Sequence, residues 1–515
     1  MLGKNLGWTS VGLAVALAAG LTACQRTPPA PAAATGADVQ PIAWREGDVD
    51  DALAEARETG KPVMLYWGAK WCPPCNQLKS TVFKDPAFIA ETRHFVPVHL
   101  DGDTAGAQHW GERFGIRGYP TLIVLRADGS EIARLSGTSH FADVLRVAAG
   151  RSTPIDALFA KAEQTPSALS QDEWQLLAAF DWQNDPRHFD DRAHAAALLG
   201  RLAAAAPEGP LKRRFALLAL TIGIDAGPDG KYTLTPAQAS QIEQLLPAIF
   251  AHADEVAANR LELSYMTTPL VAALPDAGRR AALEASLIQA LDRVYNDNSL
   301  PLPDRLGTVD ADIALAKANG GAVSSAVLAK VRARAAWADQ AAKEPMVRQS
   351  VISNAADLLH QAGDDAGAKQ LLTAELKRSA SPYYYMLDLA GIAEDEHDGK
   401  AAIDWARKAY ETSEGPATRV QWAIEYSKTV LRQAPADKAA VEAGAAAVIA
   451  ELDKNPGGYY QRTRVKVATW GGLLHKWSDT HHGKAVLARL DTRMAGVCAK
   501  QGEAAESCRK WAEGA

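Results

Sequence analysis

Two cysteines separated by two prolines are the feature that most constrains the fold of this 515-residue chain, in the segment WCPPC at 71–75. The apolar run at 63–67 before it is typical of a short buried strand, and 76–82 after it is typical of a helix. The prolines fit a first helical turn, where a missing N–H costs no hydrogen bond. The pattern predicts Cys72 at a helix start, where free N–H groups and the helix dipole stabilise a thiolate. Cys75, one turn on, could then attack a mixed disulfide formed at Cys72.

We therefore expect Cys72 to be an exposed nucleophile and Cys75 the resolving thiol. Three other uses of the pair stay open at this point. A metal site would need further ligands, and the surrounding segment contains no second C-x-x-C and no H-x-x-x-H. Haem attachment would need histidine after the second cysteine, where the chain has Asn76. A static disulfide is disfavoured by Trp71 and by the downstream Tyr119-Pro120.

Length and composition set wider limits. A chain of 515 residues predicts about two or three domains, and 47% hydrophobic residues supply ample material for cores. The net charge of −6 gives no sign of nucleic-acid binding. Five cysteines are too few for a disulfide scaffold of this length. Because the number is odd, each cysteine needs its own explanation.

Residues 1–23 have the pattern of an export signal, with Lys4 followed by an apolar stretch too short to span a bilayer comfortably. The stretch ends in LTAC, which resembles the lipobox of bacterial lipoproteins. The resemblance implies cleavage before Cys24 and a lipid on its thiol. An ordinary secretory signal and an uncleaved anchor are the alternatives. Gln25 stands where that family places Asp for inner-membrane retention, so a periplasm-facing anchor in the outer membrane is expected. Residues 24–41 are Pro/Ala-rich and indicate a tether.

Residues 42–150 predict the order β-α-β-α-β-β-α, with Gly118-Tyr119-Pro120-Thr121 opening the strand before a hairpin. This order and the tract GKPVMLYWGAKWCPPC…FVPVHLD…YPT resemble the thioredoxin fold. The tract is most similar to the thioredoxin-like domains of periplasmic disulfide-interchange (Dsb-type) reductases. The resemblance implies an α/β domain with a central mixed sheet flanked by helices.

The same resemblance implies that Pro120 is cis and lies beside the cysteines. It makes Trp71, Tyr119 and Pro120 the expected substrate-binding residues, and it implies a membrane-bound disulfide reductase as electron donor. The chain departs from thioredoxin where that family has a buried aspartate, since Tyr66 stands there. The partner lysine is missing too, because its position falls near Pro97. The direction of electron flow is therefore open.

Residues 151–515 are rich in alanine and carry apolar residues at helical spacing. They predict a large all-α region of helical hairpins stacked as a solenoid, with the best internal break at 300–322. Segments 364–372 and 397–405 resemble each other at an offset of 33 to 34 residues, the period of tetratricopeptide repeats. The signature aromatic positions of that repeat are not convincingly filled, so the prediction is tetratricopeptide-like only.

Cys498 and Cys508 flank a turn at Gly502. In an oxidising compartment they are expected to form a structural disulfide, with a second redox pair as the alternative. His475, His481 and His482 lack nearby acidic or thiol ligands, so no metal site is predicted.

The leading hypothesis is a lipid-anchored thiol–disulfide oxidoreductase of the bacterial cell envelope. It would act on periplasmic protein disulfides, preferably as a reductase, and the helical region would recruit partners. No cofactor is expected beyond the Cys72–Cys75 disulfide itself. The alternative is a lipid-anchored helical-repeat adaptor or holdase with a redox-sensing thioredoxin-like module. A copper chaperone binding Cu(I) through the reduced pair is a third possibility.

Overall fold

The computed structural model describes residues 41–512 apart from 48, 137–140, 151–152, 184, 186–190 and 319. Its N-terminal part contains a five-stranded sheet of order β1-β3-β2-β4-β5, in which β1, β3 and β2 are mutually parallel and β4 pairs antiparallel with both β2 and β5. The sheet is mixed, as expected from the sequence. The strands are β1 (Arg45–Glu46), β2 (Val63–Gly68), β3 (Val96–Asp101), β4 (Thr121–Leu125) and β5 (Glu131–Ser136).

Helices cover both faces of this sheet. The central strand β2 is buried at all six positions, because it pairs with β3 on one side and β4 on the other while helices pack above and below. The helices of this part are α1 (Val49–Thr59), α2 (Pro73–Ser80), α3 (Pro86–Thr92), α4 (Ala105–Phe114) and α5 (Phe141–Ala149), with a 3₁₀ turn η1 (Val82–Lys84). The two-residue strand β1 has no periodic signal in the sequence and exists only through its pairing with Val98 and His99.

The rest of the described chain is helical, as expected from the sequence, and short connections join most of its helices. They are α6 (Ile155–Gln164), η2 (Pro166–Ala168), α7 (Gln171–Ala179), α9 (Arg192–Ala205), α10 (Pro210–Gly223), α11 (Pro236–Phe250), α12 (Ala253–Ala258), η3 (Glu262–Thr267), α13 (Thr268–Ala272), α14 (Ala277–Asn296), α15 (Leu302–Leu306), η4 (Gly307–Val309), α16 (Asp310–Ala318), α17 (Ser325–Ala341), α18 (Pro345–Gln361), α19 (Asp365–Glu375), α20 (Pro382–Asp395), α21 (Gly399–Thr412), α22 (Pro416–Gln433), α23 (Lys438–Asp453), α24 (Gln461–Thr480), α25 (Lys484–Cys498), η5 (Gly502–Ala504) and α26 (Ala505–Arg509).

The two similar segments of the sequence occupy equivalent places in successive hairpins. Asp364 caps α19 and Asp398 caps α21, each accepting a hydrogen bond from the backbone three residues on. The residue before each cap is left-handed, with φ of 87° at Gly363 and 62° at His397. The shared turn explains why the sequence similarity is confined to these few positions.

The helical segment between α12 and α13 contains a π-helical turn, η3. Pro269 lacks the N–H that a regular helix would need at that point. The hydroxyl groups of Thr267 and Thr268 donate instead to the carbonyls of Glu262 (2.6 Å) and Ser264 (2.8 Å). Such turns occur frequently at functional sites.

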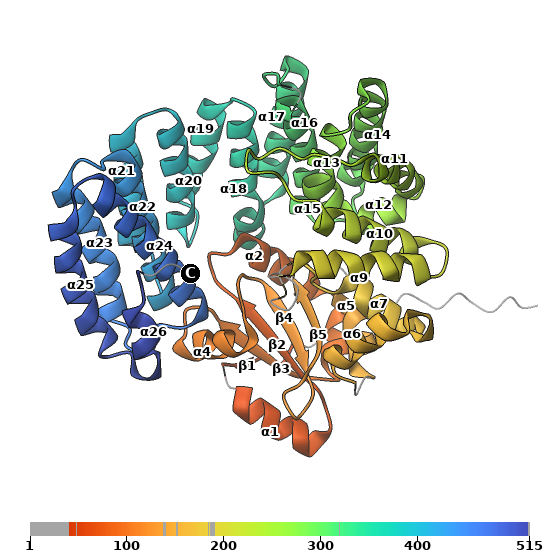
Figure 1. The fold of residues 1–515 in the computed structure, drawn as a ribbon, viewed down its shortest axis with the longest axis horizontal. Helices are drawn as coiled ribbons and strands as arrows, with labels where there is room; N and C mark the ends of the chain where they lie inside the picture. Colours follow the sequence, from red (N-terminus) through yellow and green to blue (C-terminus); the bar gives the residue numbers. More distant parts are fainter. Residues whose placement is uncertain are drawn as a thin grey trace, which may run out of the picture. The chain divides into compact units, whose positions relative to one another are not determined.

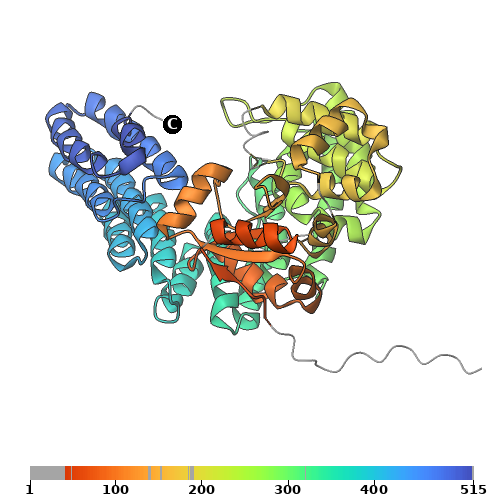
Figure 2. The ribbon, with the colours of Figure 1, turned by 90° about the horizontal axis from the view of Figure 1, so that it is seen from below.

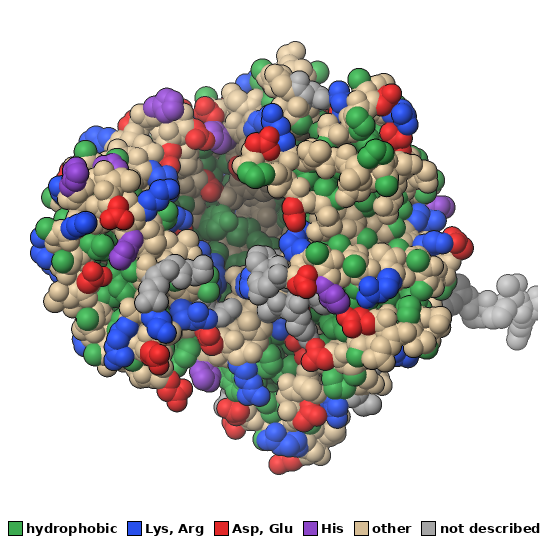
Figure 3. Space-filling view, viewed as in Figure 1, with side chains coloured by type: hydrophobic (Ala, Val, Ile, Leu, Met, Phe, Trp, Pro, Cys, Tyr) green, Lys and Arg blue, Asp and Glu red, His purple; other side chains and the backbone are tan. Residues whose placement is uncertain are grey.

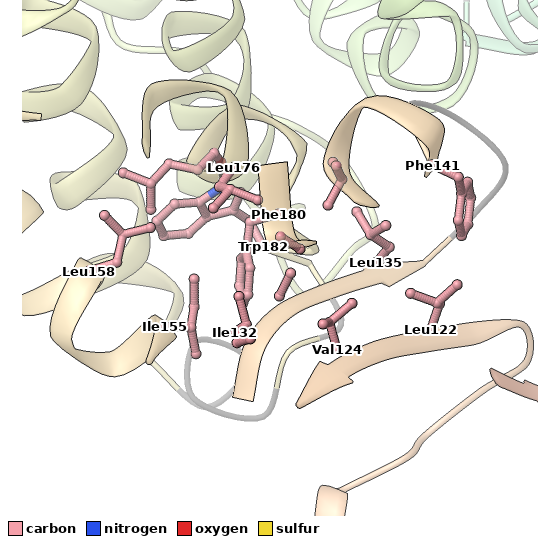
Figure 4. Packing of buried hydrophobic residues seen from close by; sticks show 14 of the residues in the cluster. Leu122, Val124, Ile132, Leu135, Phe141, Ile155, Leu158, Leu176, Phe180 and Trp182 are labelled. Carbon is pink, nitrogen blue, oxygen red and sulfur yellow. Dashed lines mark hydrogen bonds between the residues drawn. The ribbon is translucent and has the colours of Figure 1, made fainter. Parts of the chain in front are cut away.

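The sheet and the first helices of the helical region share one hydrophobic core. Leu122 and Val124 of β4 and Ile132 of β5 belong to the same buried cluster as Leu158 of α6 and Trp182. Figure 4 shows these side chains pointing toward one another from strands and helices. The helices from α6 to α10 are therefore not a separate module attached by a linker, because removing them would expose one face of the sheet.

Helices further along the chain contact the same domain at another place. Figures 1 and 2 show the sheet between the helices that follow it directly, in yellow and green, and the C-terminal helices, in blue. Among these later helices, α18 packs against α2 and α24 against α4. In the described part of the chain, no helix combines the length and hydropathy that crossing a membrane requires.

At the C-terminal end, the structure joins Cys498 to Cys508, and both side chains are fully buried beside Trp511. Replacing both cysteines by alanine should lower the free energy of unfolding by about 2–3 kcal/mol, because the unfolded chain loses a closed loop. The measurement is the denaturant midpoint under oxidising conditions. A Cys72→Ser/Cys75→Ser variant is the matched control, and an unchanged midpoint in the Cys498/Cys508 variant would contradict a stabilising role.

Candidate active site at the start of helix α2

The Cys-Pro-Pro-Cys segment forms the first turn of α2. Cys72 is the N-cap residue, and its sulfur lies 3.2 Å from the backbone N–H of Cys75, which points at it. The two sulfurs are joined in a disulfide. When the bond is reduced, the same N–H and the helix dipole favour a thiolate at Cys72.

The loop before β4 lies against this disulfide. Its Tyr119–Pro120 peptide bond is cis, and the carbonyl oxygen of Tyr119 is 3.7 Å from the Cys72 sulfur. Trp71 is next to Cys72 in the chain and is buried. The fold therefore brings together Trp71, Cys72, Cys75, Tyr119 and Pro120, all of which the sequence singled out.

Comparison with known proteins agrees with this geometry. A family model described as a thioredoxin-like domain matches residues 49–149. These residues are a thioredoxin-like domain. Strands β2 to β5, the C-x-x-C pair at a helix start and the cis-proline loop all fall inside the matched range.

The curated relatives are thiol:disulfide interchange proteins. The protein named DsbD 1 of Pseudomonas aeruginosa is 33% identical over 85 residues, which is 16% of this chain and 14% of that protein. DsbD of Vibrio vulnificus is 32% identical over 102 residues, 19% of this chain and 17% of the relative. DsbD of Ralstonia nicotianae is 33% identical over 86 residues, 16% of this chain and 14% of the relative. The chain thus matches only about a sixth of the length of these relatives, and the similarity lies in the redox domain.

The expectation of an exposed nucleophile is wrong for this structure. Cys72 is 2% exposed and Cys75 is fully buried. The helical region covers them, because side chains of α20, α21 and α22 pack into one cluster with Trp71 and both cysteines. The sequence could not show this cover, since the covering residues lie more than three hundred positions away.

A polar contact holds the cover in place. Thr418 of α22 accepts a hydrogen bond from the indole N–H of Trp71 at 2.7 Å. Its hydroxyl donates in turn to Asp103 at 2.9 Å, and its backbone N–H donates to the same carboxylate at 2.6 Å. Burial raises the pKa of Asp103, and the hydrogen bonds from Thr418 oppose that rise. Thr418 therefore links the residue before Cys72 to the loop after β3.

Aromatic rings fill the remaining space. Trp422 contacts Trp71 edge-on, with ring centroids 5.0 Å apart. Tyr384 stacks on Trp71 with ring centroids 6.2 Å apart. The indole of Trp422 also donates to the Tyr383 carbonyl at 3.1 Å. Tyr383 and Tyr385 are buried packing residues.

Further contacts extend the interface along α2 and α4. Gln77 donates to the buried carboxylate of Asp304 at 2.8 Å, and Asp304 is also paired with Arg260. On the other side, Arg464 of α24 pairs with Glu112 of α4 at 2.8 Å. The helical region thus contacts the cysteine-bearing end of the thioredoxin-like domain at both α2 and α4.

Tyr66 occupies the position that holds a buried aspartate in thioredoxin. Its ring is 1% exposed and contacts Trp44, Phe83 and His99. Burial raises the pKa of its hydroxyl, which has no hydrogen-bond partner among the described residues. Because a tyrosine with a raised pKa stays protonated at neutral pH, Tyr66 cannot take up a proton as the aspartate does.

A cavity of about 580 Å³ borders the cis-proline loop and Pro74. Its opposite wall belongs to the helical region and includes Leu261 and Tyr265, which are 37% and 47% exposed although they are large and hydrophobic. This volume lies within the range of ligand-binding pockets.

Figure 3 shows the molecular surface hollowed over α2 and α18, with apolar side chains on the floor of the hollow.

The other predicted sites are separate from this one. Cys24 lies outside the described residues. The Cys498–Cys508 disulfide packs with α23–α26 in another cluster. No cluster of three or more histidine, cysteine or acidic side chains that could hold a metal occurs in the described ranges. Sequence reasoning missed Asp103 and Thr418, which have no motif around them, and only their proximity to Trp71 in the fold reveals them.

Replacing Thr418 by valine should expose the cysteines more often. The variant keeps the side-chain shape and the backbone hydrogen bond to Asp103, but loses the hydroxyl's bonds with Trp71 and Asp103. At roughly 1 kcal/mol for the lost bonds, we expect alkylation of reduced Cys72 to become about fivefold faster. The measurement is the rate of iodoacetamide labelling, read by mass spectrometry of the Cys72 peptide. Thr469→Val is the control, because that hydroxyl bonds only within its own helix α24; equal rates in the two variants would contradict the role of Thr418.

Proposed function

We propose that this protein is a thiol–disulfide oxidoreductase acting on protein disulfides. The observation that carries the proposal is the Cys72–Cys75 disulfide at the start of α2, beside the cis-proline loop of a thioredoxin-like domain. The names of the curated relatives, which are thiol:disulfide interchange proteins, support it.

The exchange follows from the geometry of the pair. In the reduced protein, the Cys72 thiolate attacks a substrate disulfide, forms a mixed disulfide and releases one substrate thiolate, which takes up a proton. The Cys75 thiolate then attacks the Cys72 sulfur, which restores the Cys72–Cys75 disulfide and releases the second substrate thiolate. Two electrons thus pass from the protein to the substrate, one proton comes from the Cys75 thiol and one from solvent, and a reductant must return the two electrons.

The reductase direction is preferred because the tract around Cys72 resembles the thioredoxin-like domains of periplasmic disulfide-interchange reductases. A membrane-bound disulfide reductase is the proposed electron donor. The segment LTAC that ends at Cys24 supports a lipid anchor in the cell envelope, facing the periplasm and preferably in the outer membrane.

The covered site favours substrates that enter as an extended segment. A folded protein face cannot reach Cys72 while α20, α22 and α24 lie over it, whereas the cavity beside Pro74 and the cis-proline loop can admit a few residues of extended chain. Leu261 and Tyr265 give that cavity an apolar wall. The helical region would then select unfolded or flexible substrates by contact with this wall.

A redox-sensing adaptor or holdase is the second candidate, because a buried cysteine pair is suited to stoichiometric switching as well as to turnover. Insulin reduction separates the two functions. The wild type should reduce insulin disulfides catalytically with an added reductant, and Cys72→Ser should abolish the activity. Equal activity of wild type and Cys72→Ser would contradict the enzymatic function and leave the adaptor or holdase as the remaining candidate.

Cys75→Ser should trap substrates on Cys72, because the mixed disulfide can no longer be resolved. The expected result is reductant-sensitive, higher-mass adducts after the reduced variant is incubated with a denatured protein that carries one disulfide. Cys72→Ser/Cys75→Ser is the control and should form none. Adducts on the control, or none on Cys75→Ser, would contradict the assignment of roles.

Leu261→Ser should weaken the use of protein substrates specifically. Leu261→Ser removes exposed apolar surface from the cavity wall, and the lost contact costs roughly 1 kcal/mol of binding free energy. KM for an unfolded protein disulfide should therefore rise several-fold. The rate with a small disulfide such as hydroxyethyl disulfide should stay unchanged. Leu473→Ser is the matched control, because Leu473 is 41% exposed and lies on α24 outside the cavity lining. A change with both substrates would contradict a wall that selects protein chains.

A further inference from the structure

An arginine of the helical region lies over the two residues that flank the catalytic sulfur. Arg462 is at the start of α24, and its guanidinium carbon is 5.3 Å from the ring centroid of Trp71 and 4.9 Å from that of Tyr119. Trp71 precedes Cys72 in the chain, and the Tyr119 carbonyl is 3.7 Å from the Cys72 sulfur. A cation of the C-terminal half therefore lies beside the redox pair.

The charge of Arg462 is not cancelled by a direct ion pair with any described residue. Its Nη1 atom is buried and has no hydrogen-bond partner among them. The contrast with other buried arginines is clear, because Arg134, Arg260 and Arg334 each pair with a carboxylate. Aromatic ring faces hold the Arg462 guanidinium instead, an arrangement that stabilises a cation while leaving its field intact.

We propose that Arg462 sets the charge state of Cys72, stabilising the thiolate and thereby favouring the reduced form of the Cys72–Cys75 pair. The inference rests on the proposed thiol–disulfide exchange and adds a role for the helical region in it. A cation in a poorly solvated site acts more strongly on a neighbouring thiol than one in water. Reduction of the disulfide takes up two electrons and yields one thiolate and one thiol when Cys72 is ionised, so stabilising that thiolate makes the disulfide easier to reduce.

The other charged groups around the pair do not provide this effect. Asp103 is the carboxylate that acts on Arg462, and Thr418 already binds both of its oxygen atoms. Asp101 lies near Asp103 and acts on it as a like charge. Lys466, one turn along α24, has its pKa lowered by burial and by repulsion from Arg462, and Lys79 has its pKa lowered by burial. Burial lowers the pKa of Arg462 as well, but arginine starts from so high a pKa that it stays protonated, whereas these lysines are pushed toward the neutral form.

Replacing Arg462 by methionine tests the proposal. The expected result is a rise of about one unit or more in the pKa of the Cys72 thiol, measured from the pH dependence of alkylation of the Cys72 peptide in the reduced full-length protein. The equilibrium of Cys72–Cys75 with glutathione should shift by up to about tenfold toward the disulfide. Arg462→Lys should keep only part of both values, because burial at this position favours the neutral form of the lysine ammonium.

The control is Arg464→Met, which removes a cation from the same helix and breaks its ion pair with Glu112. It should leave the Cys72 pKa and the glutathione equilibrium unchanged, so a general loosening of the interface cannot imitate the expected result. Equal shifts in Arg462→Met and Arg464→Met, or no shift in either, would overturn the proposal. Because neither readout needs a substrate, failure of the oxidoreductase function would show separately, as absent insulin reduction with a normal Cys72 pKa.

Discussion

The core shared by the sheet and the first helices of the helical region is the packing on which the rest of the arrangement depends. It fixes α6–α10 on the face formed by β4 and β5, so the helical array starts from a defined place on the thioredoxin-like domain. The array continues through hairpins and meets the same domain again at α2 and α4. Because both ends of the array are held, the cysteine pair lies at a closed interface rather than on a free surface.

This closure changes the chemistry that the motif can perform. A C-x-x-C pair at a free helix start would meet any protein disulfide, whereas here Thr418, Trp422 and Tyr384 stand where a folded partner would dock. The cover also brings groups that the thioredoxin-like domain lacks. Arg462 supplies a cation near Trp71 and Tyr119. The thioredoxin-like domain itself has no acid at the buried position where thioredoxin has an aspartate, because Tyr66 stands there. The proposed substrate choice and redox behaviour would therefore depend on both regions together.

The elements of the redox domain could be located from the sequence because their signals are local. Strand β2 is a continuous apolar run, and α2 follows from prolines and a cysteine that caps its own helix. The capping aspartates Asp364 and Asp398 likewise marked two helix starts correctly. Strand β1 and the π-helical turn before Pro269 were missed, because the first is created by pairing and the second by side-chain hydrogen bonds that replace a missing N–H.

The sequence by itself located the cysteine pair at a helix start, and the resemblance to thioredoxin placed the cis-proline loop beside it. These relations hold within a few residues or follow from one compact fold. Only the tertiary structure decided how accessible that chemistry is and what charge surrounds it. Trp71 and its hydrogen-bond partner Thr418 are 347 residues apart, and no periodicity or motif connects positions so distant. Their contact exists because long-range packing of apolar helix faces brings them together, and that packing depends on the whole core rather than on any local pattern.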